Sequence, residues 1–147
     1  MKTHKIPVSV LVVIYTSDRQ VLLLERADHP GYWQSVTGSC DPGESLRQTA
    51  MREVREETGI DAGKYALTDW GLQFEFEIFE EWRHRYAPGV THNTEHVFGL
   101  ELPEPLDVIL APKEHLDCFW LSREVAVNKV FSWTNAAALE KLPLMAK

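Results

Sequence analysis

Short blocks of apolar residues, separated by polar turns, fill the first part of the chain. Residues 8–15 are almost continuously apolar and rich in β-branched side chains, so they predict a buried strand. Polar residues 17–20 interrupt this run, and residues 21–26 predict a second strand that pairs back on the first. A short extended segment is expected at residues 33–37.

The clearest helical pattern covers residues 46–58. Ser45 and Gln48 form the S-x-x-Q pattern of a capping box, in which the side chain of each residue binds the backbone N–H of the other. Apolar residues then recur every four positions, which gives the helix one buried stripe. Gly59 follows where a helix commonly ends in a left-handed residue.

The rest of the chain mixes strands and helices without a regular βαβ repeat. The predicted elements are strands at residues 70–80, 95–102 and 117–121, a loop at 83–93, a brief helix after Ser122 and a terminal helix from Ser132 to Pro143. This order favours the α+β class, as an α/β/α sandwich on a mixed central sheet. No linker divides the chain, so we expect a single domain over residues 1–147.

The chain is acidic. It has 15 Lys and Arg against 22 Asp and Glu, a formal net charge of −7, and its 44% hydrophobic residues are typical of a globular protein. Proteins that bind nucleic-acid backbones or anionic membrane surfaces depend on clustered Lys and Arg. The charge therefore argues against both partners, but it allows a small polyanion if a cation accompanies it.

The N-terminal region and the cysteines indicate a cytoplasmic protein. The apolar run at residues 8–15 is far shorter than the ~20 residues of a membrane span, and no small-residue cleavage site follows it. Cys40 and Cys118 are best interpreted as two reduced thiols. The chain is long enough to be a monomer, although the sequence does not specify the oligomeric state.

Three carboxylates share a narrow arc of the predicted helix. At about 100° per residue, Glu57 lies about 40° and Glu56 about 60° from Glu53, so like charges repel at the edge of the core. This spacing alone favours a solvated acidic face on which Arg52 pairs with Glu56. A divalent cation with oxygen ligands is the alternative explanation. Gly38, whose carbonyl can face the helix, shifts the balance toward a metal site.

The same residues fit a longer pattern, G-x5-E-x7-R-E-U-x-E-E-x-G-U, where U is apolar. Its fixed positions are filled by Gly38, Glu44, Arg52, Glu53, Val54, Glu56, Glu57, Gly59 and Ile60. Over residues 38–60 the chain thereby resembles the Nudix hydrolases. The resemblance implies the α/β/α sandwich of that family and the cleavage of a nucleoside diphosphate linked to another moiety. It also implies a requirement for Mg²⁺ or Mn²⁺.

Other segments resemble a bacterial branch of this family that releases pyrophosphate from dihydroneopterin triphosphate in folate synthesis. These segments are Arg26, residues 32–38, 76–79, 83–90, 93–95 and 114–116, and Ser132-Trp133. Many Nudix proteins have Pro-Gly-Gly before the motif, whereas this chain has Val36-Thr37-Gly38, as the pterin branch does. The alternatives are a pyrophosphohydrolase of purine or other (deoxy)nucleoside triphosphates and a non-catalytic binding module.

The resemblance implies roles for individual residues. The expected catalytic and metal-binding set comprises Glu53, Glu56 and Glu57 as metal ligands, the Gly38 carbonyl as a further ligand, Arg52 to hold one carboxylate, and Glu114 as a loop ligand or base. Glu95 is the rival of Glu114, because it also lies near the start of a strand. Glu114 could instead be a solvated loop glutamate.

The substrate is expected to be a small-molecule triphosphate, held by basic and aromatic residues. The candidates are Lys5 and Arg26 for phosphate, Thr37 for phosphate or ring, Phe76, Glu77, Ile78 and Phe79 as a strand edge for the ring, and Ser132 before the last helix. Arg26 is suited to bidentate phosphate contact. Helix capping is the stronger explanation of Ser132, and the basic segment 83–85 could either be solvated or contact the substrate.

Overall fold

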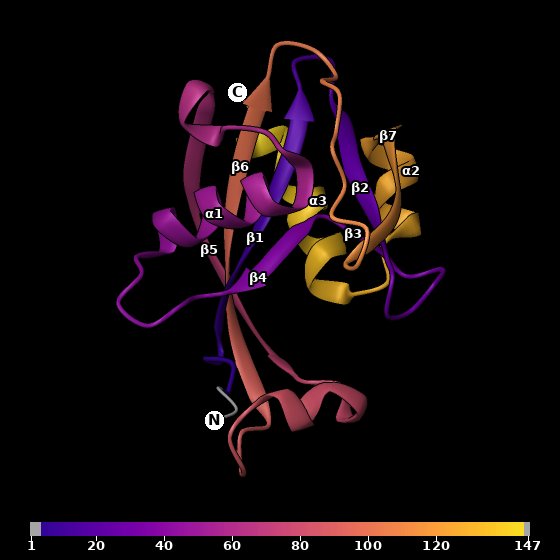
Figure 1. Ribbon diagram of the computed structural model, residues 1–147. Coiled ribbons are helices and arrows are strands. Elements are labelled where there is room, and N and C mark those ends of the chain that lie inside the picture. The colour runs from indigo at the N-terminus through magenta and orange to yellow at the C-terminus, as the bar shows by residue number, and fades with distance from the viewer. Residues whose placement is uncertain (1–3, 146–147) are drawn as a thin grey trace.

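The computed structural model describes residues 4–145, which form a seven-stranded mixed sheet with helices on both faces (Figure 1). The strands are β1 (Val8–Thr16), β2 (Gln20–Arg26), β3 (Trp33–Gln34), β4 (Val36–Ser39), β5 (Ala66–Glu77), β6 (His92–Leu102) and β7 (His115–Ser122). The helices are α1 (Leu46–Thr58), α2 (Arg123–Lys129) and α3 (Trp133–Met145), with 3-10 turns η1 (Ala62–Lys64) and η2 (Glu80–Arg85). The expected α+β class with a mixed sheet is confirmed.

The sheet forks at its central strand. β1 runs parallel to β6 along its whole length, but it pairs with β2 only at Tyr15 and with β4 only over residues 9–12. β2 therefore continues away from β1 and carries β3 and β7, while β4 pairs with β1 alone. The two prongs leave space between them, and residues of both prongs line the cavity described below.

Strand alternation divides the core into two clusters, one on each face of the sheet. Val10, Val12 and Ile14 of β1 point toward α1, and this side is called the α1 face. Leu11 and Val13 point the other way, toward α2 and α3, and this side is called the α3 face. In Figure 1, α1 lies in front of the sheet and α3 behind it.

Helix α1 has the predicted bounds, residues 46–58, and the predicted caps. The Ser45 hydroxyl accepts from the Gln48 backbone N–H at 3.1 Å, and the Gln48 side chain accepts from the Ser45 N–H at 2.8 Å. Gly59 is left-handed, with φ at 77°, and its N–H donates to the Arg55 carbonyl. This conformation costs glycine little because it has no Cβ.

Several predicted boundaries differ from the structure, three of them by the most residues or for a clear reason. The segment expected to be a loop over 83–93 contains the end of η2, and β6 begins at His92. β5 begins at Ala66, before a register shift in its pairing with β6. The terminal helix continues past Pro143 to Met145, because a proline in the last turn removes only one intrahelical hydrogen bond.

Strands β5 and β6 extend beyond the rest of the sheet, and η2 closes this arm at the bottom of Figure 1. The Lys5 backbone N–H donates to the Arg85 carbonyl at 2.8 Å, which ties η2 to the N-terminal segment. Within residues 4–145, no helix is both long and apolar enough to cross a membrane.

Candidate active site

A cavity of about 670 Å³ opens between the two prongs of the sheet, α1, η2 and the start of α3. This volume suits a small organic molecule. Side chains that are far apart in sequence meet there, and they form three groups. A carboxylate group lies on α1, a basic group lies near η2, and a polar group with aromatic neighbours lies beside α3.

Glu53 and Glu57 form the carboxylate group and lie one helical turn apart. Glu57 is almost fully buried, with 2% of its surface exposed. Glu53 packs directly on Gly38 of β4, where a Cβ atom would fall 2.5 Å from Glu53 Oε1 and closer still to Cδ. Glycine at position 38 is therefore what allows the carboxylate to lie against the strand.

Burial and mutual repulsion make this pair electrostatically costly. Burial raises the pKa of Glu57 well above its ordinary value, and the nearby Glu53 and Glu114 raise it further. Burial also raises the pKa of Glu53, although Arg52 opposes this shift. His115 Nε2 lies 3.6 Å from Glu57 Oε1, but burial and the charge of Arg26 lower the pKa of His115 to about 4, so it supplies no cation at neutral pH.

Arg52 holds the carboxylates of Glu44 and Glu53 in place. Its guanidinium donates to Glu44 Oε2 at 2.8 Å and Oε1 at 2.9 Å, and to Glu53 Oε1 at 2.6 Å. A further bond to the Ser39 carbonyl, at 2.9 Å, ties this network to β4. The hydrogen bonds from Arg52 lower the pKa of Glu44 to about 2. Arg52 therefore positions Glu53 rather than neutralising the whole group.

The donor set fits a hard divalent cation. Glu57 Oε1 is buried without a hydrogen-bond partner, and a cation is the kind of partner that such an oxygen lacks. No three His, Cys, Asp or Glu side chains converge into a complete metal site within residues 4–145. Glu56 is exposed, lies 3.4 Å from Arg52 and does not line the cavity, whereas Glu114 does line it. Glu53, Glu57, Glu56, Glu114 and the Gly38 carbonyl all stay predictions as ligands.

Lys5 and Arg26, both predicted to bind phosphate, lie together with Arg85 in the basic group. Arg26 pairs with both oxygens of Asp28 at 2.7 Å, and Arg85 reaches the same carboxylate at 3.1 Å. These hydrogen bonds lower the pKa of Asp28 to about 2. Although Lys5 is exposed as a residue, desolvation of its ammonium and repulsion from Arg85 and Arg26 lower its pKa. Three cations and one carboxylate leave this part of the lining positive.

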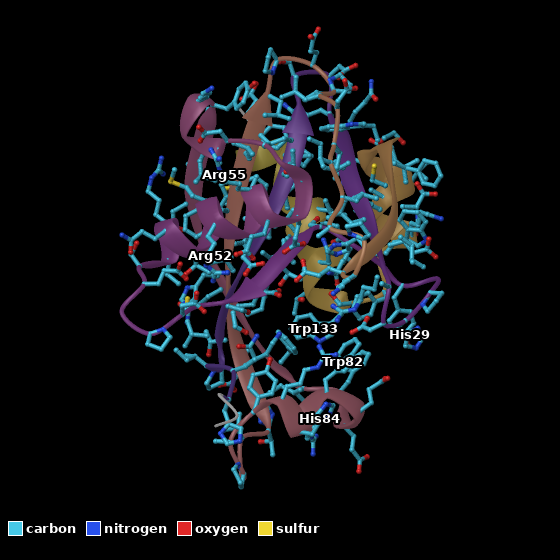
Figure 2. The ribbon with its side chains drawn as sticks, viewed as in Figure 1. His29, Arg52, Arg55, Trp82, His84 and Trp133 are labelled. Carbon is cyan, nitrogen blue, oxygen red and sulfur yellow. The ribbon has the colours of Figure 1, made fainter. Side chains whose placement is uncertain are left out.

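The basic segment at residues 83–85 is divided by its fold. Arg83 turns to Glu77, at 2.9 Å, and His84 is exposed on the outer side of η2 (Figure 2). Only Arg85 of the three lines the cavity. The sequence pattern did not single out Arg85, because its place depends on the backbone hydrogen bond that joins η2 to Lys5.

The polar group contains Glu95, the rival candidate to Glu114. Glu95 and Asn93 lie two residues apart on β6 and are 5% and 3% exposed. Burial raises the pKa of Glu95 to about 7, while hydrogen bonds with Thr134 and Thr37 oppose this shift. Asn93 Nδ2 donates to Ser9 Oγ at 2.7 Å. Neither Asn93 nor Thr134 was a candidate from the sequence.

Aromatic rings border the polar group. Trp133 is 61% exposed and lines the cavity, with Phe74 edge-on to it at 5.7 Å between ring centroids. Phe79 stacks on Trp82 at 5.2 Å, and Phe131 lies edge-on to both. Figure 2 shows Trp82 and Trp133 where η2 faces the body of the molecule. Such walls suit the faces of a flat ring.

The remaining candidates also line the cavity, and several of their polar atoms already form hydrogen bonds within the protein. Phe76, Glu77, Ile78 and Phe79 all lie in the lining. The backbone of Ile78 is occupied, because its N–H donates to Thr91 and its carbonyl accepts from Arg83. The Thr37 hydroxyl donates to the Val10 carbonyl at 3.0 Å. Ser132 Oγ accepts from the Asn135 N–H at 3.1 Å, which is the expected capping role.

The sheet with helices on both faces, the motif of residues 38–60 on and before helix α1, and the cavity beside it point to one family. The Nudix domain profile matches residues 5–142, and the chain belongs to the Nudix family of hydrolases. The resemblance seen in residues 38–60 is therefore confirmed across nearly the whole chain.

Relatives with known names narrow the comparison. The chain is 49% identical to the dihydroneopterin triphosphate diphosphatase of Escherichia coli K12, over 99% of this chain and 97% of that protein. It is 44% identical to the Haemophilus influenzae protein of the same name, over 96% and 90%. The solved E. coli dihydroneopterin triphosphate pyrophosphohydrolase superposes with a TM-score of 0.91, covering 97% of this chain and 99% of that one.

Proposed function

We propose that this protein hydrolyses dihydroneopterin triphosphate to dihydroneopterin monophosphate and pyrophosphate. The observation that carries the proposal is the near-full-length similarity to two bacterial enzymes named for this substrate. The cavity supports it, because carboxylates, cations and a polar group bordered by aromatic rings all line the same space. A triphosphate joined to a bicyclic ring offers a partner for each of these three groups.

The reaction is a substitution at phosphorus. A water oxygen forms a bond to the α-phosphorus, the bond from that phosphorus to the bridging oxygen breaks, and pyrophosphate leaves with that oxygen. Mg²⁺, or Mn²⁺, would bind Glu53 and Glu57 with Glu56, Glu114 and the Gly38 carbonyl as further ligands, and would supply charge neutralisation and a more acidic water. Arg52 keeps the Glu53 carboxylate aimed into the cavity.

The other residues orient the substrate. Lys5, Arg26 and Arg85 oppose the negative charge of the phosphates from the side facing η2. Glu114 takes the proton from the attacking water, or serves as a ligand, because it is an exposed glutamate of the cavity lining whose charge raises the pKa of Glu57. The protein therefore brings its positive side chains to the leaving group and its negative ones to the nucleophile.

A pyrophosphate-release assay tests the substrate. We expect kcat/KM for dihydroneopterin triphosphate to exceed that for each dNTP by roughly tenfold or more. A dNTP preferred by a similar factor would replace the proposal with a nucleoside triphosphate pyrophosphohydrolase. No Mg²⁺-dependent release from any triphosphate would favour a binding module instead.

Substitution of the glutamates tests the mechanism. Glu53→Gln should abolish release from every triphosphate, and Glu114→Gln should lower kcat by roughly a hundredfold. Glu104→Gln is the matched control, because Glu104 is an exposed loop glutamate outside the cavity. A Glu114→Gln enzyme with near wild-type kcat would remove Glu114 from the mechanism.

A further inference from the structure

Two buried oxygen atoms of β6 face the cavity without a partner. They are Glu95 Oε1 and Asn93 Oδ1. Because the two residues are separated by one position on a strand, their side chains lie on the same face of the sheet. Buried polar atoms are normally hydrogen-bonded, and an orphan at a cavity wall is typical of a place where a ligand completes the bonding. Both orphans can accept hydrogen bonds.

The protein holds the two side chains in place from behind. Asn93 Nδ2 donates to Ser9 Oγ at 2.7 Å, which leaves Oδ1 as the unused atom of the amide. The other carboxylate oxygen of Glu95 lies 3.5 Å from the Thr37 hydroxyl, and Thr134 of α3 also bonds this carboxylate. These contacts order the side chains before any ligand arrives, and they leave one acceptor on each.

Glu95 lies on the opposite face of the sheet from the α1 carboxylates. In the ladder, Glu95 is level with Ser9 of β1, whereas Gly38 is level with Val10, the next residue along. Glu53 packs on Gly38 from the α1 face, so Glu95 points to the α3 face. Within residues 4–145, the causes of the raised pKa of Glu95 are burial and the opposing hydrogen bonds with Thr134 and Thr37, with no charged side chain among them. Glu95 is thus separated from the residues that would bind a metal.

The polar group also has the walls that a ring requires. Trp133 presents an exposed face at its edge, and Phe131 and Phe79 line the same cavity nearer to η2. An aromatic face beside convergent acceptors recognises a flat heterocycle through stacking and through N–H groups on one edge. Phosphate cannot be the ligand here, because two acceptors would repel it.

We propose that Glu95 and Asn93 bind the N–H edge of the substrate's ring and select a 2-amino-4-oxo-pyrimidine edge, as found in a pterin or in guanine. The ring amino group and the adjacent ring N–H are the two donors that the two acceptors require. This inference rests on the proposed function, since it assigns the end of the substrate that the phosphate-binding residues leave unassigned. Glu95 is then a specificity residue rather than the catalytic base.

The test compares substrates that differ only in these donors. dGTP has both the ring N–H and the 2-amino group, while dITP lacks the amino group. We expect the wild-type protein to favour dGTP in kcat/KM by roughly tenfold or more, and Glu95→Gln to reduce this ratio to within about threefold. Loss of a catalytic base or of a metal ligand would lower both rates equally and leave the ratio at its wild-type value. That result would overturn the proposal.

Binding without phosphate gives a second readout. Titration calorimetry with neopterin, guanosine and inosine needs neither metal nor turnover. We expect neopterin and guanosine to bind and to lose roughly ten- to a hundredfold in affinity with Glu95→Gln, while inosine binds weakly to both proteins. Asn93→Ala should act in the same direction and serves if the Glu95 variant does not fold. Equal affinity of the wild type for guanosine and inosine would contradict the assignment.

A matched control separates local charge from ring recognition. Glu75→Gln makes the same chemical change on the neighbouring strand β5, where the side chain is exposed and outside the cavity. It should leave the dGTP to dITP ratio and neopterin binding unchanged. If the wild type prefers another triphosphate to dihydroneopterin triphosphate, the proposed function fails, but the nucleotide ratio and the nucleoside titrations still decide the role of Glu95.

Discussion

Replacement of Gly38 by alanine should displace the Glu53 carboxylate and thereby lower the activity that depends on the carboxylate group, Glu53 and Glu57. The added Cβ atom would fall 2.5 Å from Glu53 Oε1 and closer to Cδ. Ordinary contacts between non-bonded heavy atoms are ~3.5–4.0 Å. Glu53 must therefore move by about 1 Å or more, and its hydrogen bond to Arg52, at 2.6 Å, must stretch or break.

The expected losses follow from this displacement. A misplacement of about 1 Å in a reacting group costs roughly a hundredfold in rate. Stability should change little, within about 1 kcal/mol, because Gly38 does not have a positive φ and the obstructing atoms belong to the end of a side chain. Alanine also reduces the entropy of the unfolded chain, which offsets part of any strain.

Two measurements check this prediction. Pyrophosphate release at saturating substrate gives kcat, and Mn²⁺ titration followed by electron paramagnetic resonance gives metal affinity. Gly63→Ala is the matched control, because its Cβ would meet only the ends of the Met51 and Asp61 side chains, at 3.1 and 3.2 Å, and Gly63 does not line the cavity. If Gly38→Ala kept both kcat and Mn²⁺ affinity within about threefold of wild type, the close packing of Glu53 on β4 would have no role in activity.

Three further predictions concern stability. Glu44→Gln should lower the free energy of unfolding by on the order of 2 kcal/mol at pH 7, because Arg52 lowers the pKa of Glu44 in the folded protein from 4.5 to about 2. This stabilisation is complete above pH 4.5 and is lost as the pH falls toward 2. Urea titrations of the wild type and the variant should therefore converge in acid. Asn135→Ala should cost about 2–4 kcal/mol in urea titrations, since the buried side chain holds both the backbone and the hydroxyl of Ser35. Gly59→Ala should lower the thermal midpoint by several degrees, equivalent to about 1–2 kcal/mol, because its φ is 77°; an unchanged midpoint would contradict the cap assignment.

The local parts of the structure could be predicted from the sequence. Helix α1 was predicted with its bounds because Ser45, Gln48 and Gly59 encode both ends within a few residues. The proximity of Glu53 and Glu57 follows from helical geometry alone. Lys5 and Arg26 were predicted as phosphate-binding candidates, and both line the cavity.

The parts that depend on distant pairing could not be predicted. Arg85 reaches the cavity because the β5–β6 arm folds η2 against the N-terminal segment, which no local pattern encodes. The face on which Glu95 lies follows from the register of β6 against β1, and a shift of one residue would reverse it. The contact of Thr134 with Glu95 joins α3 to β6 and depends on how the helix packs on the sheet.

The central strand β1 gives its two faces different environments, with the signature helix packed on one and the polar group beside α3 on the other. The residues that identify the family are confined to one side of this partition. Substitutions in the polar group on the α3 face can occur independently of the motif, because these residues do not contact the Arg52 carboxylate network. A sheet built this way can retain one hydrolytic chemistry while lineages exchange the molecules to which it is applied.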